Sequence, residues 1–363
     1  MTARPGEGGA VRSGALLGAP SVEIVVPLRR GRSLLLHRRA LVTAALLLLA
    51  ALAVSLGSLL TGAYRLSAAD ALAVLAGSGS DLDRFIVLDQ RLPRALAALL
   101  VGAMLALSGA VFQSLSRNPL GSPDIIGFTR GATTGGLVVI LLASASSLSM
   151  IALGTILGGF ATAALVVLVA LRRGASGDAL ILAGIALSQM LAAGDDYLLT
   201  RATIESAETA KAWQFGSLNA ITWAQVRPLM VAALLLLPLI AWLGRPAGIL
   251  ELGDDAANSL GLGAARARGT LLGYGVVLAA VCVAVSGPIA FLALAAPQLA
   301  GRASRSAGIA LAASAAMGAL LLALADFFAA RLLSPFQIPV GLVSAACGGL
   351  YLLWFVGLRR QEQ

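Results

Sequence analysis

Residues 95–116 read ALAALLVGAMLALSGAVFQSLS, a continuous run without aspartate, glutamate, lysine or arginine. A helix needs about 20 mostly apolar residues to cross the hydrocarbon core of a bilayer, so this stretch predicts a transmembrane helix. Further charge-free stretches cover residues 40–64, 131–171, 179–194, 228–244, 269–301, 306–325 and 332–358. Two of them are long enough to cross twice, because residues 144–147 interrupt one and residues 286–288 interrupt the other. The sequence therefore predicts about ten spans.

Composition places the whole chain in the membrane class. The 363 residues are 59% hydrophobic and only 12% charged, and the mean hydropathy is +0.92. A soluble domain carries about twice that share of charged residues. We therefore predict an all-α polytopic membrane protein, with residues 40–358 as the transmembrane domain.

The arginines predict the orientation of the chain, since basic residues collect in cytoplasmic loops. The first 39 residues contain seven arginines, and the chain ends with Arg359-Arg360 near its last residue. An even number of spans puts both termini on one side, which we predict to be the cytoplasm, in a bacterial inner membrane. The net charge of +9 then reflects topology. A nucleic-acid interface would need one continuous basic face, which the sequence does not show.

Residues 1–39 are rich in glycine, arginine and serine and have no apolar period, so we expect a disordered basic tail, with a second short tail at residues 359–363. The alternative is a signal peptide ending in the run from Ala40, but that run is longer than a typical signal. His37, the single histidine, lies in this tail and cannot build a histidine-based metal or catalytic site. Cys282 and Cys347 both fall in predicted spans and support no disulfide.

No nucleotide-binding loop is present, since such a loop ends in Gly-Lys-Ser or Gly-Lys-Thr and the only lysine is Lys211. The chain must therefore use an ion gradient through buried carboxylates or depend on a separate ATPase subunit. Only Asp195, Asp196 and Asp326 come near the membrane interior, and we expect them to be solvated or capping acids at helix ends. This favours the ATPase partner, and we expect neither enzymatic activity nor a bound metal or cofactor in this chain.

The predicted inside loop at residues 250–263 reads LELGDDAANSLGLG. Asp254 and Asp255 favour a helix N-terminus, Ala256 and Ala257 permit close approach, and Gly261 favours a stop. This pattern predicts a short helix lying across the membrane face. It is either a docking element for a partner or an ordinary loop helix.

Four further motifs carry a resemblance to a family. They are RLPR at residues 91–94, NPLGSPD at 118–124, GPIAF at 287–291 followed by APQ at 296–298, and QIPVG at 337–341. Together with the loop 250–263 they resemble the permease subunits of type II ABC importers for ferric siderophores, haem and cobalamin, the FecCD family. The resemblance covers residues 40–358. Within the family, residues 112–124 and the segment around Gly216-Ser217-Leu218-Asn219 look most like the second permease of ferric-enterobactin importers.

The resemblance implies a set of partners and sites. A second permease, by expectation a different chain, and two ATP-binding subunits that hold ATP and magnesium would complete the transporter, and a binding protein would deliver a ferric siderophore. The implied ATPase-coupling residues are Glu251, Gly253, Asp254, Asp255, Ala256, Ala257, Ser259 and Gly261. The implied docking residues for the binding protein are Arg91, Arg94 and Arg331, the inner gate Ser176 and Asp178, and the structural motif positions Asn118, Pro119, Gly287, Pro297, Gln298, Pro339 and Gly341.

Two positions depart from the family pattern. Arg331 lies one place later than the corresponding arginine of cobalamin permeases, which turns a helical side chain by about 100°. Gln298 stands where many members carry histidine, so this position can donate and accept hydrogen bonds but cannot titrate. The alternative to a docking role for Arg91 and Arg94 is anchoring at the membrane interface or pairing with Asp89.

Residues 106–109 (ALSG) and 284–287 (AVSG) each precede a proline by the same interval, at Pro119 and Pro297. This faint echo suggests two five-helix halves forming an inverted repeat. The predicted function is import of a ferric siderophore, enterobactin-like, by an ABC importer. The alternatives are haem or cobalamin import by the same fold, and a secondary transporter driven by an ion gradient.

Overall fold

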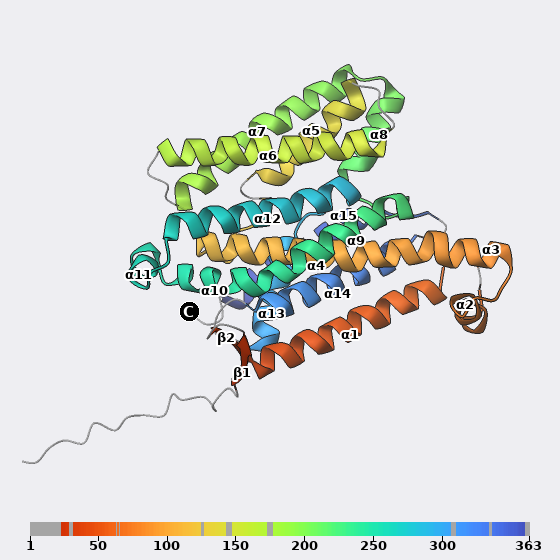
Figure 1. Cartoon of the computed structure of the whole chain (residues 1–363). Coiled ribbons are helices and arrows are strands. Elements are labelled where there is room, and N and C mark those ends of the chain that lie inside the picture. Colours follow the sequence, from red (N-terminus) through yellow and green to blue (C-terminus); the bar gives the residue numbers. More distant parts are fainter. Residues whose placement is uncertain are drawn as a thin grey trace, which may run out of the picture.

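The computed structural model describes residues 23–359 except 29–31, 63, 65, 125–126, 143–146, 173–176, 306–309 and 334–335. Helices dominate this part of the chain and lie roughly side by side, as Figure 1 shows. The elements are β1 Glu23–Leu28, β2 Arg32–His37, α1 Arg38–Leu60, α2 Ala68–Leu75, α3 Asp81–Arg84, the π-helix η1 Phe85–Arg91, α4 Leu92–Ser116, α5 Phe128–Leu142, α6 Leu148–Arg172, α7 Gly177–Arg201, α8 Ile204–Gln214, α9 Trp223–Leu236, the 3₁₀ turn η2 Leu237–Leu239, α10 Ile240–Glu251, α11 Asp254–Ser259, α12 Ala264–Ser286, α13 Leu292–Ser304, α14 Leu311–Ala329 and α15 Val340–Arg359.

Each short charge-free stretch overlaps one helical segment. The two long stretches, residues 131–171 and 269–301, overlap two helices each. The breaks fall where the sequence indicated: α5 and α6 flank residues 143–147, and α12 ends at Ser286. Among the described residues six helices are long and apolar enough to cross a membrane. The 13 residues of α13 rise only about 20 Å, less than a bilayer core. The prediction of an all-α polytopic membrane protein is confirmed.

Helix α4 is the centre of the bundle. It packs against α12, α13 and α14, and 78% of the most apolar window of the span Asp81–Ser116 is buried, against 11% for α1. Small residues allow this close packing, as is common between membrane helices. A Cβ atom at Gly102 would lie 2.3 Å from the carbonyl oxygen of Gly318 in α14, and one at Gly109 would lie 1.7 Å from that of Ala293.

We expect Gly109→Ala to destabilise the bundle, because an added methyl group overlaps the α13 backbone and forces the two helices apart. Overpacking of this kind costs about 1–3 kcal/mol. Gly273→Ala in α12 is the matched control, since no atom lies within 4 Å of the added group. Thermal unfolding of the two purified variants in detergent measures the difference. Equal melting temperatures would contradict the close approach of α4 and α13.

The N-terminal tail contains a hairpin that the sequence analysis did not predict. Strands β1 and β2 pair antiparallel, with Glu23 opposite His37 and Leu28 opposite Arg32. The segments EIVVPL and RSLLLH hold short apolar runs that suit paired strands. Each run is only six residues long or shorter, so the many glycines and arginines around it dominated the prediction of a disordered tail. Residues 1–22 lie outside the described residues.

The echo that suggested an inverted repeat does not occupy equivalent places. Residues 106–109 lie in the middle of α4, whereas residues 284–287 end α12. Pro119 lies in the turn after α4, whereas Pro297 lies inside α13. The arrangement into two related halves stays a prediction, without support from these two motifs.

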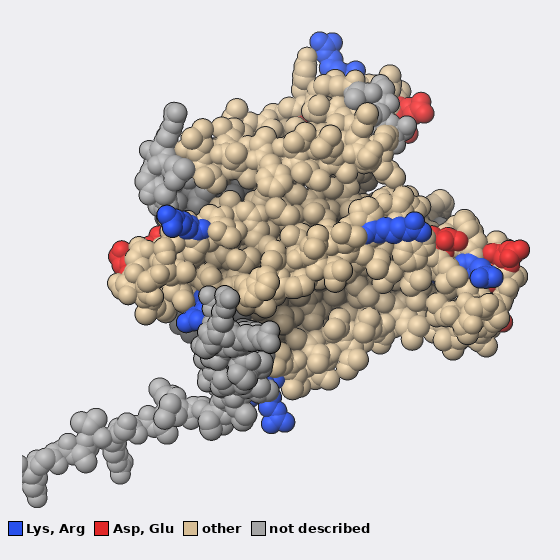
Figure 2. All heavy atoms as spheres, in the orientation of Figure 1, with Lys and Arg blue, Asp and Glu red and all other residues tan. Residues whose placement is uncertain are grey.

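Charged side chains lie mostly toward two ends of the molecule. Figure 2 shows a broad uncharged band between these ends on the visible face. One end carries α11 and the hairpin, and we name it the α11 end. The opposite end carries α2 and α3, and we name it the α3 end. This division is typical of a protein whose middle is surrounded by lipid.

Candidate functional site

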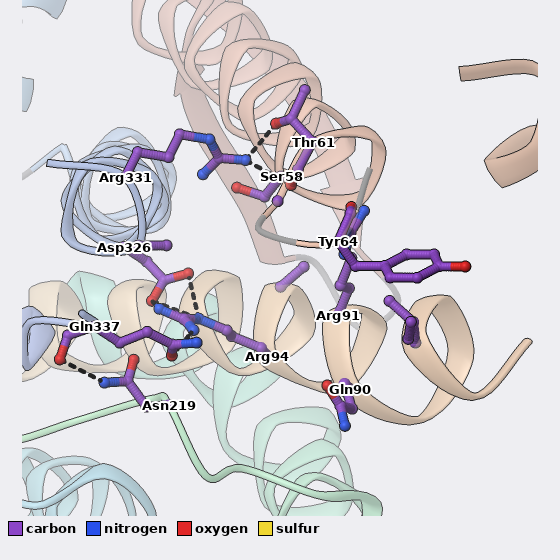
Figure 3. Close-up of a pocket in the computed structure, with 14 residues that line it drawn as sticks. Ser58, Thr61, Tyr64, Gln90, Arg91, Arg94, Asn219, Asp326, Arg331 and Gln337 are labelled. Carbon is purple, nitrogen blue, oxygen red and sulfur yellow. Dashed lines mark hydrogen bonds and ion pairs between the residues drawn. The ribbon is translucent and has the colours of Figure 1, made fainter. Parts of the chain in front are cut away.

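The three arginines predicted to dock a partner line one pocket at the α3 end. The pocket has a volume of about 260 Å³ and is bounded by the C-terminal end of α1, η1, the start of α4 and the segment after α14. Figure 3 shows Arg91, Arg94 and Arg331 around it, together with Asp326 and Gln337. Arg91 and Gln337, which the structure brings together here, are 246 positions apart in the sequence.

Arg94 is engaged inside the protein. Its Nε donates to both carboxylate oxygens of Asp326 at 3.0 Å, and its Nη1 donates to Oε1 of Gln337 at 2.9 Å. Asn219 donates to the backbone oxygen of Gln337 at 3.5 Å. The side chains of Arg94 and Asp326 are 15% and 5% exposed. This network, which we call the Arg94 clasp, joins α4, α14 and two loops (Figure 3).

Arg91 and Arg331 are also held by the chain itself. Arg91 donates to the carbonyl oxygens of Leu59 and Tyr64, each at 2.8 Å, rather than to Asp89. Arg331 donates to the carbonyl of Thr61 at 2.8 Å and to its hydroxyl, and its guanidinium lies 3.7 Å from the centroid of the Phe327 ring. Both arginines therefore fix the end of α1 to the bundle.

The three arginines make this pocket positively charged. Burial lowers the pKa of Arg331, while the nearby Asp326 carboxylate raises it. Arginine stays protonated in proteins near neutral pH, so the pocket keeps its positive charge. The docking role of Arg91, Arg94 and Arg331 remains a prediction. In this conformation the guanidinium groups of all three arginines donate hydrogen bonds to acceptors within the chain.

The expectation for two of the three aspartates was wrong. Asp326 is 4% exposed and Asp195 is 1% exposed, so neither is a solvated or capping acid. Each faces an arginine from another helix, at 3.0 Å for Arg94 and at 3.8 Å for Arg130. Only Asp196 is exposed as expected. A buried carboxylate needs such a partner because an isolated buried charge is costly.

The predicted helix in loop 250–263 is present as α11, at the α11 end. Asp254 and Asp255 form its first turn, as expected from the helix dipole. Gly261 has φ +79° and its N–H bonds to the carbonyl of Asn258, while the N–H of Leu262 bonds to that of Ala257. These two bonds form a Schellman cap, which ends the helix where the glycine predicted.

One face of α11 is open to solvent and the other packs on the protein. The open residues include Asp255 and Ser259, and the flanking Leu252 and Leu260 are 67% and 64% exposed. Ala257 is completely buried and packs inward, so it cannot contact a partner directly. The other residues predicted here are Glu251, Gly253, Asp254, Ala256 and Gly261, and each is at least partly exposed.

Three features of this loop were not predicted from the sequence. Oδ1 of Asn258 accepts from the backbone N–H of Ala264 at 3.0 Å and so caps α12. Arg268 pairs with Asp254, which ties α11 to α12. The two exposed leucines were also overlooked, although leucines flanking a predicted loop helix are a usable signal for docking.

The motif residues at the α11 end form a second network. Gln298 donates to the carbonyl of Pro119 at 2.6 Å, and its Oε1 accepts from the hydroxyl of Tyr351 at 3.1 Å. Oδ1 of Asn118 accepts from the N–H of Leu120 at 2.9 Å, which shapes the turn after α4. Gln298 thus uses both its donor and its acceptor.

The remaining motif positions hold crossing loops in place. The N–H of Gly341 donates to the carbonyl of Gly216 at 3.0 Å, and that of Ser217 donates to Ser286 at 2.8 Å. Gly287 lies beside this crossing, Pro339 precedes α15, and Pro297 is buried inside α13.

Of the predicted gate residues, Ser176 lies outside the described residues. Asp178 lies in the first turn of α7, and its side chain is not described.

Known proteins are similar to this chain in sequence and in fold. A sequence model of the FecCD transport family matches residues 45–357. The ferric enterobactin transport system permease protein FepG of Escherichia coli is 44% identical over 316 residues, covering 87% of this chain and 96% of that protein. The hemin transport system permease protein HmuU of Yersinia pestis is 35% identical, covering 79% of this chain and 87% of that one.

A solved structure agrees with these relatives. An inward-facing metal-chelate type ABC transporter is 32% identical with a TM-score of 0.76, and the match covers 86% of this chain and 98% of that one. The family model spans nearly the whole predicted transmembrane domain, residues 40–358. The chain belongs to the FecCD transport family, whose relatives named here are permease proteins of transport systems.

Proposed function

We propose that this chain is the transmembrane permease subunit of an ATP-driven importer that moves a ferric siderophore into the cytoplasm, with a catecholate such as ferric enterobactin as the favoured cargo. The observation that carries the proposal is the 44% identity to the ferric enterobactin permease over 96% of that protein. The structure adds an exposed helix suited to docking a partner at one end of the bundle.

ATP hydrolysis is assigned to a separate subunit, because the sequence contains no phosphate-binding loop and only one lysine. Two such subunits would dock on the α11 end. Their closure would push α11 and tilt the helices continuous with it. A second, similar permease and an extracytoplasmic binding protein would complete the assembly, in line with the family. Asp255 and Ser259, which are exposed on α11, would contact the ATPase.

The orientation follows from this assignment. If α11 meets an ATPase, the α11 end is cytoplasmic and the N-terminal hairpin is cytoplasmic too. The positive-inside tendency agrees with this orientation. Arg38 begins α1, and Arg117 and Arg305 directly follow α4 and α13. Arg245 and Arg266 lie in α10 and α12, the helices on either side of α11. Ten spans would bring the C-terminus to the same side.

Uptake in proteoliposomes tests the proposal. The permease is reconstituted with its ATPase, its second permease and its binding protein, and labelled iron is followed as ferric enterobactin. We expect accumulation that needs ATP and the binding protein. Haemin and cobalamin, each offered in excess, serve as competitors and should not displace the chelate. Accumulation driven by an ion gradient without the ATPase would overturn the proposal, and displacement by haemin or cobalamin would change the cargo.

A further inference from the structure

A cavity with an apolar wall and several polar side chains lies between α5, α7 and α15, apart from the arginine pocket and from α11. Its volume is about 370 Å³, and its walls include the first turns of α5 and α15, the end of α8 and the segment 288–290. The polar side chains that line it are Asp124, Thr129, Arg130, Thr133, Ser188 and Gln214. Pockets of this kind combine an apolar wall with a few polar groups that orient a ligand.

Arg130 is the charged group in this cavity with unused bonding capacity. Its side chain is 43% exposed, and its one ion pair within the described residues is with Asp195 at 3.8 Å. No described residue accepts a hydrogen bond from its guanidinium. A guanidinium has five N–H donors in a planar fork suited to anionic oxygens. These donors are therefore available to a ligand in the cavity.

Asp195 explains why a cation is held here. It is 1% exposed, and neither carboxylate oxygen has a hydrogen-bond partner among the described residues. The neighbouring Thr134 hydroxyl does not meet hydrogen-bond geometry. Arg130 lies 3.8 Å from this carboxylate and acts on it through charge. Asp195 thus attracts Arg130 without occupying its donors.

Asp124 is the second carboxyl group at the cavity. Burial raises the pKa of the Asp124 carboxyl, while the nearby Thr129 hydroxyl and the backbone N–H of Phe291 lower it in part. Ser188, on the α7 wall, has a buried hydroxyl oxygen without a hydrogen-bond partner in the described part of the chain. The Arg130 guanidinium and the Ser188 hydroxyl therefore both offer unused hydrogen-bond donors at the cavity.

We propose that this cavity is an oxyanion-binding subsite on the transport route, in which Arg130 contacts anionic oxygen atoms of the cargo and Asp195 is the positioning residue. The inference rests on the proposed function and names a contact for its cargo. A ferric catecholate is anionic, because the phenolate charges exceed the charge of the ferric ion. A cavity of this size receives one arm of such a complex, while the rest lies in the space that a second permease would enclose.

A change of charge at one position tests the subsite. In a Cys347→Ser background, which removes the exposed native thiol, Arg130→Cys is reconstituted and then treated with a methanethiosulfonate that adds either an ammonium or a sulfonate group. We expect Arg130→Cys to lower kcat/KM for ferric enterobactin uptake tenfold or more, mainly through KM. The ammonium reagent should restore most of the uptake, and the sulfonate reagent should restore none.

Three controls separate this role from a structural one. Cys347→Ser alone should transport normally with either reagent. Arg130→Lys keeps the charge and should retain more uptake than Arg130→Gln, which has a similar size but no charge. Asp195→Asn should raise KM less than Arg130→Gln does, because Arg130 remains present. Co-elution of each variant with its partners on gel filtration shows that the complex is assembled.

The outcomes are distinct. Equal rescue by both reagents, or normal uptake by Arg130→Gln, would overturn the subsite and leave the proposed function intact. If the unmodified complex transports no ferric catecholate, the proposed function fails and the subsite fails with it. Charge-dependent rescue with normal assembly supports the subsite.

Discussion

Asp326→Asn is expected to lower the stability of the permease by about 3–5 kcal/mol, because it leaves the guanidinium of Arg94 buried opposite a neutral group. Arg94 donates to both oxygens of this carboxylate, and the two side chains are almost fully enclosed. Asparagine has one oxygen and no charge, so part of the Arg94 clasp remains but its ionic component is lost. Thermal unfolding in detergent and the abundance of the protein in membranes measure the effect.

The matched control is Asp89→Asn, the same change at an exposed aspartate of η1 on the same end of the molecule. It should change the melting temperature little, since exposed charges contribute about 0–1 kcal/mol. An equal effect of both substitutions would contradict a structural role for the clasp.

A double variant, Arg94→Met with Asp326→Leu, connects this result to docking. Replacing both members of a buried pair with apolar groups of similar size is often neutral or stabilising. We expect the double variant to recover most of the stability that Asp326→Asn loses. Its uptake then reports on docking by Arg94 alone, separated from the stability of the bundle.

Asp255→Arg is expected to abolish uptake while the chain still inserts and folds. Asp255 is exposed in the first turn of α11, where a positive charge opposes the helix dipole and reverses the charge that a partner would meet. Gly261→Pro should have the same effect by another route. Proline holds φ near −65° and lacks the N–H that Gly261, at φ +79°, donates to Asn258.

ATP-driven uptake and copurification with the ATPase subunit are the measurements. Glu205→Arg is the matched control, because Glu205 is an exposed acid in the first turn of α8. It should leave copurification and uptake unchanged. Normal uptake by Asp255→Arg would refute a docking role for α11, and poor insertion of this variant would show that Asp255 is needed for folding instead.

The local features of this protein could be read from the sequence. Charge-free length predicted the spans, the serine and glycine breaks predicted where two spans separate, and two acids followed by Gly261 predicted α11 and its end. Each of these signals depends on neighbouring residues and on the backbone they favour. Gln298 also behaves as its chemistry suggested, since it uses one donor and one acceptor.

The long-range pairings could not be read in this way. Arg94 and Asp326 are 232 positions apart, and only the packing of α4 against α14 brings them together. Without that contact Asp326 resembles any acid at a helix end, which is why solvation was the natural expectation. The same holds for Arg130 and Asp195, which meet across α5 and α7.

The Arg94 clasp also constrains how the chain is made. Synthesis delivers α4 to the membrane long before α14, so Arg94 enters lipid or the insertion machinery without its carboxylate. A lone charge within a membrane helix is costly, and the cost persists until the ribosome has added 232 more residues. We therefore expect Arg94 to lack its carboxylate partner until α14 has been synthesised. A nascent chain that stops before α14 carries an unpaired cation at the start of α4.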